Sequence, residues 1–367
     1  MLFSDNFRYS FYICQQIKGL INMTNNSFSI RLREARLMMG LSMDKLVERT
    51  NGAITKQSIS RYEKGIMRPK RGALQAIAKA LNISEEYFEG TNLKIDMPML
   101  RTTSNGKLSE DELQALEAKL SFWAEQYLTK ERMIHCQSSF DKDNSFKNLL
   151  FKNPVKGTKV STLEDAIHAA DLLRKRWHSG DGPIASVLRL LERKGIKILS
   201  TELPDNVWGM STWADNCHPL MVLDMRPEKT TIERLRFTAA HELAHLLLTF
   251  PVNVDLDVEK RCNKFAGFFL FTKQALIEEM GSEKRDELML EEMIDLKEVY
   301  GISIAAQVHA AWDIRMISRE HYDWWFDEKI KKNRLEVGWG EYVFPETIGR
   351  ERRMDVRIVN IEKNNLK

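Results

Sequence analysis

The sequence is poor in the features that mark secreted and membrane proteins. Its 367 residues include four cysteines, and none of them forms a C-x-x-C pair. Scattered cysteines argue against a disulfide framework or a thiolate zinc site and favour a reducing cytoplasm. No apolar run approaches the roughly 18 residues that a membrane helix needs. We therefore expect a cytoplasmic protein that does not cross a membrane.

The chain also carries little net charge, and a total of +3 indicates no particular partner. Apolar residues make up 43% of the sequence and charged residues 29%, as is typical of a globular protein. A chain of this length can form two or three domains, each with its own hydrophobic core.

Residues 1–27 show no convincing helical or strand period. Asp5 and Arg8 interrupt the apolar residues where a signal peptide would need an apolar core. We interpret this stretch as a leader that is either disordered or lies upstream of a true start at Met23. The sequence leaves Met1 and Met23 open as starts.

Short helical patterns separated by small turns fill residues 28–90. Ser42 and Thr55 are suited to cap the second and third helices of this stretch. A fourth helix is expected over 71–81, and a fifth from Ser84. Five helices in about sixty residues predict a compact helical domain.

This stretch resembles the Xre/Cro-type, lambda-repressor-like helix-turn-helix domains. The likeness rests on Leu41-Ser42-x-x-x-Leu46, Ser58-Ile59-Ser60-Arg61-Tyr62-Glu63-Lys64-Gly65 and Pro69. The chain departs from the commonest spacing by what looks like two extra residues in the turn, at 51–54. Twelve Lys and Arg against seven Asp and Glu give residues 28–90 a local charge of +5, which suits phosphate contacts.

The resemblance implies a double-stranded DNA operator as a partner. In this motif the second helix presents its early residues to base edges in the major groove, where Gln suits adenine and Arg suits guanine. Ile59 and Tyr62 fall on the opposite side of that helix and are expected in the core. The candidate DNA-binding residues are Lys56, Gln57, Ser58, Ser60 and Arg61.

Residues 91–160 are interpreted as a linker with one helix, from Ser109 to about Met133. Ser109 can cap that helix, and Glu112 stands at the capping-box position. The helix could be a dimerising arm, which would make the protein a homodimer, or a strut on the following domain. The sequence leaves both open.

An H-E-x-x-H motif, His241 to His245, lies within residues 237–249. These residues are rich in Ala and Leu and contain no Pro or Gly, so we expect a helix. Four residues apart on a helix, the two histidines share a face and can bind one Zn²⁺, with Glu242 beside it as general base. The alternative is a buried helix that carries two histidines by chance.

Further elements are expected on both sides of the motif. A loop and then a helix over 258–270 should follow it. A small sheet before it would let an extended substrate add as a further strand at the sheet edge. The helices and strands expected before the motif cover 163–177, 183–194, 195–199, 207–213 and 220–224.

A catalytic zinc site needs a third protein ligand and leaves the fourth position for water. Glu259 is our candidate, because it opens the next helix, where a carboxylate also meets the helix dipole favourably. Asp255 and Asp257 are nearby competitors, and an exposed glutamate without a ligand role is the other alternative. Thr238 and Asn263 are expected to orient the ligands from a second shell.

Two runs near the motif resemble the ImmA/IrrE family of zinc metallopeptidases, over about 162 to 320. They are Arg236-Phe237-Thr238-x-Ala240-His241-Glu242-Leu243-Ala244-His245-Leu246-Leu247-Leu248 and Glu259-x-x-Cys262-Asn263-x-Phe265-Ala266. The resemblance implies a gluzincin-like fold with zinc bound by His241, His245 and Glu259. Cys262 stands where the family usually has Ala, and it is either a redox-sensitive thiol or a small buried side chain.

We therefore predict a mainly α protein with a small β-sheet, an α+β fold. A helix-turn-helix domain at 28–90 would precede a metallopeptidase domain at 161–320 and a C-terminal extension at 321–367. The resemblance implies an endopeptidase that cleaves a repressor or antitoxin-like regulator. The alternative is a non-catalytic repressor or antitoxin whose metal site is structural or sensory. His218, His309 and Tyr300 are open candidates for stabilising an oxyanion.

Overall fold

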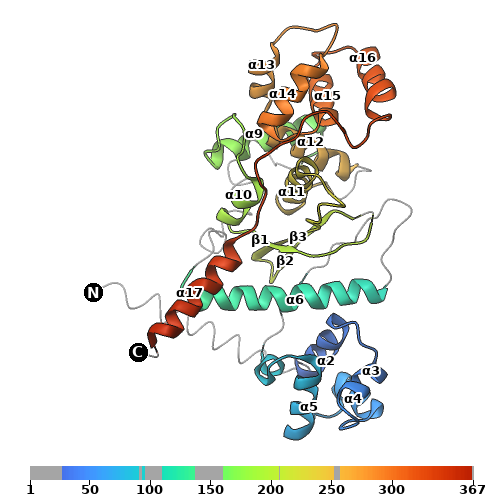
Figure 1. Ribbon diagram of the computed structural model, residues 1–367, viewed down its shortest axis with the longest axis vertical. Helices are drawn as coiled ribbons and strands as arrows, with labels where there is room; N and C mark the ends of the chain where they lie inside the picture. Colours follow the sequence, from blue (N-terminus) through green and yellow to red (C-terminus); the bar gives the residue numbers. More distant parts are fainter. Residues whose placement is uncertain are drawn as a thin grey trace. The chain divides into compact units, whose positions relative to one another are not determined.

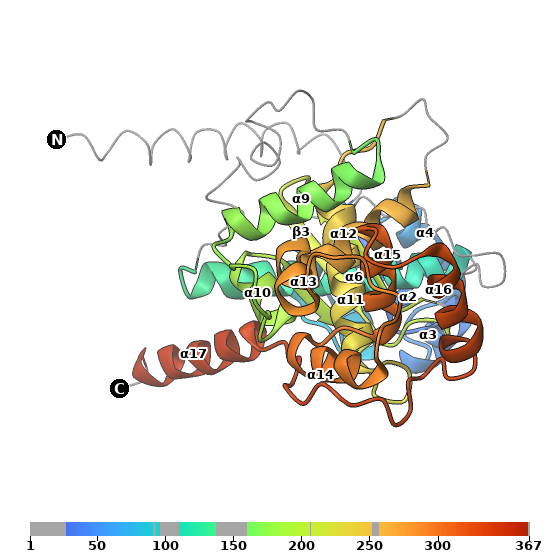
Figure 2. The ribbon, with the colours of Figure 1, turned by 90° about the horizontal axis from the view of Figure 1, so that it is seen from above.

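The computed structural model describes residues 27–90, 93–95, 110–136, 160–205, 207–251 and 257–365. The leader up to residue 26, most of the linker at 91–160 and Asp255 lie outside these ranges. The chain divides into two compact units, Met1–Lys94 with Leu108–Trp123, and Ile95–Lys107 with Ala124–Lys367. Figures 1 and 2 show their elements from two directions.

Short helices build the first unit. Ser42 caps the second of them by accepting from the backbone N of Lys45, and Thr55 caps the third by accepting from Ser58, as predicted. The expected fifth helix is present as a 3-10 helix rather than an α-helix. The elements are α2 (Ser27–Met38), α3 (Met43–Arg49), α4 (Lys56–Glu63), α5 (Arg71–Leu81) and η1 (Glu85–Glu89).

The core of the first unit holds α4 by one face. Ile59 and Tyr62 of α4 are buried, which confirms their predicted place in the core. Arg36 of α2 binds Glu63 at the end of α4 through two bonds, of 2.6 and 2.9 Å. Arg36 also donates to the backbone oxygen of Leu41, which holds its guanidinium in place. Two bonds from a guanidinium held in this way fix the rotation of α4.

A three-stranded sheet lies in the second unit, with strands at the three places predicted. Its order is β1-β3-β2, with β1 parallel and β2 antiparallel to β3. Strand β2 is therefore an edge, and Ile95 forms an isolated antiparallel bridge with Ala214 at its end. The strands are β1 (Lys197–Ser200), β2 (Gly209–Ala214) and β3 (His218–Leu223).

Two helices precede the strands in the chain, and two follow them. The H-E-x-x-H motif is on α11, the first helix after the strands, as predicted. Helix α11 packs against β2, β3, α10 and α12, and α12 packs also against α9. Helix α10 is shorter than the expected 183–194, because Ser186 caps it immediately before Val187. The helices are α9 (Leu163–Arg176), α10 (Val187–Arg193), α11 (Ile232–Leu247) and α12 (Val258–Leu270).

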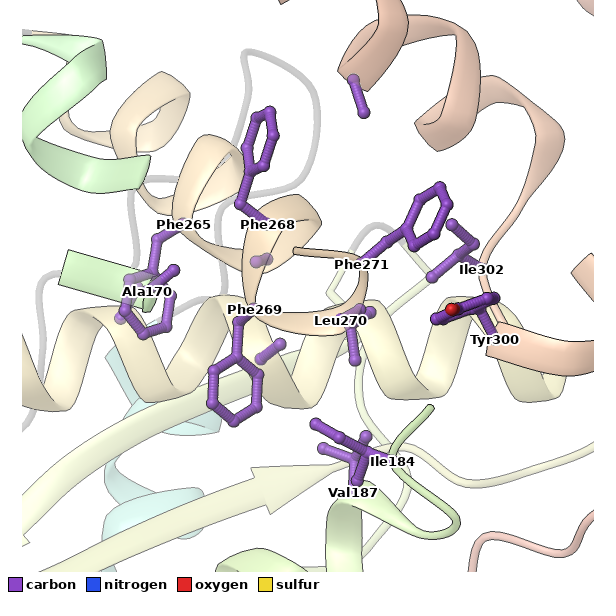
Figure 3. Packing of buried hydrophobic residues seen from close by; sticks show 14 of the residues in the cluster. Ala170, Ile184, Val187, Phe265, Phe268, Phe269, Leu270, Phe271, Tyr300 and Ile302 are labelled. Atoms are coloured by element: carbon purple, nitrogen blue, oxygen red, sulfur yellow. The ribbon is translucent and has the colours of Figure 1, made fainter. Parts of the chain in front are cut away.

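Aromatic side chains of α12 fill the core of the second unit (Figure 3). Phe265 and Phe269, four residues apart, stack with ring centroids 5.7 Å apart. Trp177 meets Phe269 edge-on at 5.8 Å. Because these rings bury one side of α12 in the core, the opposite side of its first turns is available to polar side chains.

The remaining helices follow in the same unit. Helices α14 and α15 lie on either side of Gly301, which adopts a left-handed conformation with φ 61°. Trp325 is buried, whereas Trp324 is 43% exposed. The elements are α13 (Lys273–Met280), α14 (Leu290–Tyr300), α15 (Ile304–Asp313), α16 (Arg319–Trp324), the π-helix η2 (Trp325–Ile330) and α17 (Arg350–Asn365).

A fully buried ion pair joins α11 to the C-terminal segment. The side chains of Arg236 and Glu346 both have no exposed surface, and Nη1 lies 2.5 Å from Oε1. Arg236 also donates to the backbone oxygens of Ile184, Tyr300 and Gly301. Glu346 in turn accepts from the first backbone N–H groups of α10. One guanidinium therefore connects four segments.

Among the residues that the structure describes, no helix combines the length and the apolar character needed to span a bilayer.

The buried pair should contribute strongly to stability. Replacing Glu346 with Gln leaves the guanidinium of Arg236 buried without its counter-charge, which typically costs about 3–5 kcal/mol. We expect a clear fall in the urea midpoint of the second unit, followed by circular dichroism. The exposed Glu341 of the same segment provides the control, because Glu341→Gln should leave the midpoint unchanged. Equal midpoints for both variants would contradict this role.

Acid should weaken the contacts of His321. Its Nε2 accepts from the backbone N of Leu288 (3.0 Å) and from Trp325 Nε1 (3.1 Å), so a proton there would disrupt both bonds. Burial lowers the pKa of His321, and the nearby Glu287 only partly opposes this effect. A folded-state pKa below the unfolded value means that stability is fully present above about pH 6.5 and falls below it.

We therefore expect the urea midpoint to decrease between about pH 7.5 and 5.5, and His321→Gln to flatten that decrease. His168, an exposed histidine on α9, is the control, and His168→Gln should keep the wild-type profile. An unchanged profile in His321→Gln would show that another group titrates.

Candidate DNA-binding surface and metal centre

Helix α4 presents its polar face to solvent. Lys56, Gln57 and Arg61 are exposed, and Ser58 and Ser60 are half-buried. The Ser58 hydroxyl already bonds with that of Thr55, at 2.9 Å, as part of the helix cap. Lys56 Nζ pairs with Asp44 Oδ2 at 2.7 Å, so Gln57 and Arg61 are the best placed of the five predicted residues to reach a base edge.

The metal-ligand candidates come together on α11 and α12. The Nε2 atoms of His241 and His245 lie 3.0 Å apart. Oε2 of Glu259 is 3.2 Å from the first of these atoms, and Oε1 is 3.5 Å from the second. Ligand atoms about 2.0–2.2 Å from a tetrahedral zinc ion are roughly 3.3 Å apart, so this donor set fits zinc.

Local sequence explains why Glu259 rather than its neighbours occupies this place. Asp257 caps α12, because its side chain accepts from the backbone N of Lys260 at 3.1 Å. Glu259 then falls in the first turn, facing the two histidines of α11. His241, His245 and Glu259 place their ligand atoms within 4.8 Å of one another.

The other ring nitrogens of the histidines also have partners on α12. Nδ1 of His241 lies 2.8 Å from Oδ1 of Asn263, the residue predicted to orient a ligand. Nδ1 of His245 lies 3.7 Å from the Sγ of Cys262, which is fully buried. Thr238 makes a different contact, since its methyl group packs against Gly209 of β2.

Electrostatics at this cluster favour a positive charge. Hydrogen bonds with His241 and His245 hold the pKa of Glu259 well below its usual range. Burial opposes a charge on His245, but hydrogen bonds with Cys262 and Glu259 outweigh burial and raise its pKa to about 11. Both shifts show that the carboxylate of Glu259 favours a positive charge beside it, which a metal cation would also supply once the histidines are neutral.

Glu242, the predicted general base, is buried beside β2. Burial raises the pKa of its carboxyl group above the ordinary value. The Ser211 hydroxyl lies 2.7 Å from Oε2 and 3.0 Å from the backbone oxygen of Glu242, and can donate to either. A Cβ on Gly209 would lie 3.3 Å from the Glu242 Cγ, so this glycine allows β2 to approach closely.

Sequence reasoning missed Ser211. The available signal was weak: a small polar residue, two positions after Gly209, in a strand expected beside the motif helix. Alternating residues of a strand share a face, which places both of these residues toward α11.

The candidates for oxyanion stabilisation have other contacts. The Tyr300 hydroxyl is near Glu279, to which it donates at 2.8 Å. His309 lies with Nδ1 3.0 Å from the Tyr322 hydroxyl.

Comparison with known proteins identifies the first unit. Residues 32–88 match the protein-family model described as Helix-turn-helix. This region therefore forms a helix-turn-helix domain that binds double-stranded DNA, and the chain is a DNA-binding regulator. No curated protein and no solved structure matches the chain.

Removing side chains of α4 should weaken operator binding. We expect Arg61→Ala to reduce affinity by about 1–3 kcal/mol, and Gln57→Ala to relax specificity at one base pair, because both are exposed on α4. DNA selected from a random pool by the full-length protein provides the probe, and fluorescence anisotropy gives the affinity. Lys79→Ala, at an exposed position of α5, is the control. Wild-type affinity in both α4 variants would assign recognition to another surface.

Proposed function

We propose that the protein is a transcription regulator whose second unit is a zinc-dependent endopeptidase. One observation carries this proposal: His241, His245 and Glu259 converge while Glu242 lies buried beside them. The proposed substrate is a protein, a repressor or antitoxin-like regulator, and the proposed place of action is the cytoplasm.

The residues of the cluster divide the work of metal binding. His241 and His245 would bind Zn²⁺ through Nε2 and Glu259 through its carboxylate. Asn263 supports the first histidine, since its Oδ1 accepts the Nδ1 proton and leaves Nε2 free of one. When bound, zinc supplies Lewis-acid polarisation of a carbonyl group and acidifies water.

Glu242 would transfer the proton of hydrolysis. Ser211 occupies Oε2, which leaves Oε1 to accept a proton from the attacking water. The water oxygen bonds to the peptide carbonyl carbon, the C–N bond breaks, and Glu242 passes the proton to the amine that leaves. Burial raises the pKa of this carboxyl group, so Glu242 is a stronger proton acceptor than an ordinary carboxylate and can hold the proton until it passes to the amine.

The sheet edge offers a way to present the substrate. Strand β2 carries Ser211, the residue that touches Glu242, and is an edge of the sheet. Ile95 already pairs with Ala214 there, so this edge accepts an extended chain in antiparallel fashion. A substrate segment that pairs along β2 would bring its backbone near Glu242.

The domain combination supports a regulatory substrate. A peptidase joined to a DNA-binding domain acts where regulators act, and the resemblance of residues 162–320 to ImmA/IrrE peptidases favours a repressor or antitoxin-like target. Helix-turn-helix proteins commonly bind paired half-sites as dimers, so a homodimer is part of the proposal.

Replacing the general base tests the proposal. Glu242→Gln should bind one zinc ion per chain and operator DNA like the wild type, because it leaves both sets of binding residues intact. It should lose cleavage of repressors encoded nearby, with a rate reduction of at least about 100-fold. Zinc content by mass spectrometry, operator binding by anisotropy and cleavage by gel electrophoresis are the measurements.

Two further variants complete the experiment. Glu259→Gln should lose zinc as well as cleavage, and Glu283→Gln, at an exposed position, should lose neither. Cleavage of a repressor should relieve the repression of its target genes. If Glu242→Gln relieves this repression as well as the wild-type protein does, the peptidase proposal is wrong. The site would then be structural or sensory in a non-catalytic repressor.

A further inference from the structure

Helix α12 turns three neighbouring side chains toward the histidines of α11. Glu259, Cys262 and Asn263 stand at positions i, i+3 and i+4, which share one face of a helix. Glu259 faces the Nε2 atoms, and the other two each contact one Nδ1 atom. A single helix thus supplies both a ligand and the contacts behind the other two ligands.

A histidine that binds a metal through Nε2 must carry its proton on Nδ1. That proton needs an acceptor, which fixes the tautomer and the orientation of the ring. For His241 the acceptor is the amide oxygen of Asn263, at 2.8 Å. For His245 the only Nδ1 contact that the described residues show is the sulfur of Cys262, at 3.7 Å.

Burial makes the thiol important. Cys262 has no exposed surface, so water cannot easily take its place as the acceptor. Sulfur is a weak acceptor with a large radius, and a separation of 3.7 Å is within its hydrogen-bonding range. Full burial also argues against a redox role, since an oxidant would have to reach the sulfur.

We propose that Cys262 is a positioning residue that accepts the Nδ1 proton of His245 and thereby holds that ring ready to bind zinc. This inference rests on the proposed zinc site. It assigns the sulfur a function beyond filling space between α11 and α12. Because sulfur accepts more weakly than an amide oxygen, losing Asn263 should reduce zinc affinity more than losing Cys262.

Zinc affinity of the full-length protein tests this assignment. Competition with a chromophoric chelator would give the dissociation constant for zinc in each variant. Cys262→Ala should weaken binding by about tenfold, at the lower end of the effect of removing such a partner. Cys262→Ser keeps an acceptor of similar size and should stay within about threefold of the wild type. Cys217→Ala removes a thiol elsewhere and should change nothing.

A second measurement separates hydrogen bonding from packing. In the zinc-loaded protein with labelled histidine, the Nδ1 proton resonance of His245 should move downfield in Cys262→Ser, because oxygen accepts more strongly than sulfur. Packing alone would leave this resonance unmoved. The thermal midpoint of each metal-free variant shows whether that variant is folded. If Cys262→Ala is not folded, the zinc affinity and the Nδ1 resonance of Cys262→Ser test the inference instead.

The outcomes are distinct. Wild-type zinc affinity in Cys262→Ala, equal losses in the Ala and Ser variants, or an unmoved resonance in Cys262→Ser would each overturn the inference and leave the zinc site intact. If the wild-type protein binds no zinc, the proposed function fails together with the inference. Asn263→Ala calibrates the method, because it removes the stronger of the two acceptors.

Discussion

The second unit depends on one buried cation. The guanidinium of Arg236 has no exposed surface, and α11, which carries it, also carries the histidine pair. A charge so far from water is tolerated only if counter-charge and hydrogen bonds surround it, and Glu346 with three backbone oxygens does so. The direction of α11 is therefore set by the same contacts that satisfy this charge. That direction also determines which side chains of α11 face α12.

The cluster of His241, His245 and Glu259 is an outcome of how two helices pack. Stacked phenylalanines hold one side of α12 in the core, and its N-terminal turn contacts the C-terminal half of α11. That arrangement places Glu259 before His241 and His245, and brings the Nδ1 partners along one turn later. On the other side of α11, strand β2 contacts Glu242 through Ser211. The histidine pair and Glu242 are thus supported by different elements, α12 and β2.

Local signals accounted for much of the fold. Ser42 and Thr55 cap the helices that follow them, as predicted, and the 3.6-residue period located α5, α9 and α12. The residues that escaped prediction act over long sequence distances. Ser211 and Glu242 are 31 positions apart, and Arg236 and Glu346 are 110 apart. Helix α17 was missed because many of its side chains are exposed and leave no clear apolar stripe.

The position of Glu346 in the chain has a consequence for biosynthesis. A ribosome delivers the helix-turn-helix unit early, and its short-range contacts can form while the rest of the chain is being made. The motif helix is different, because its arginine has no carboxylate partner until residue 346 has been translated. The order of synthesis thus lets the DNA-binding unit mature first, and the unit with the histidine pair reaches its final packing only after residue 346 has been made.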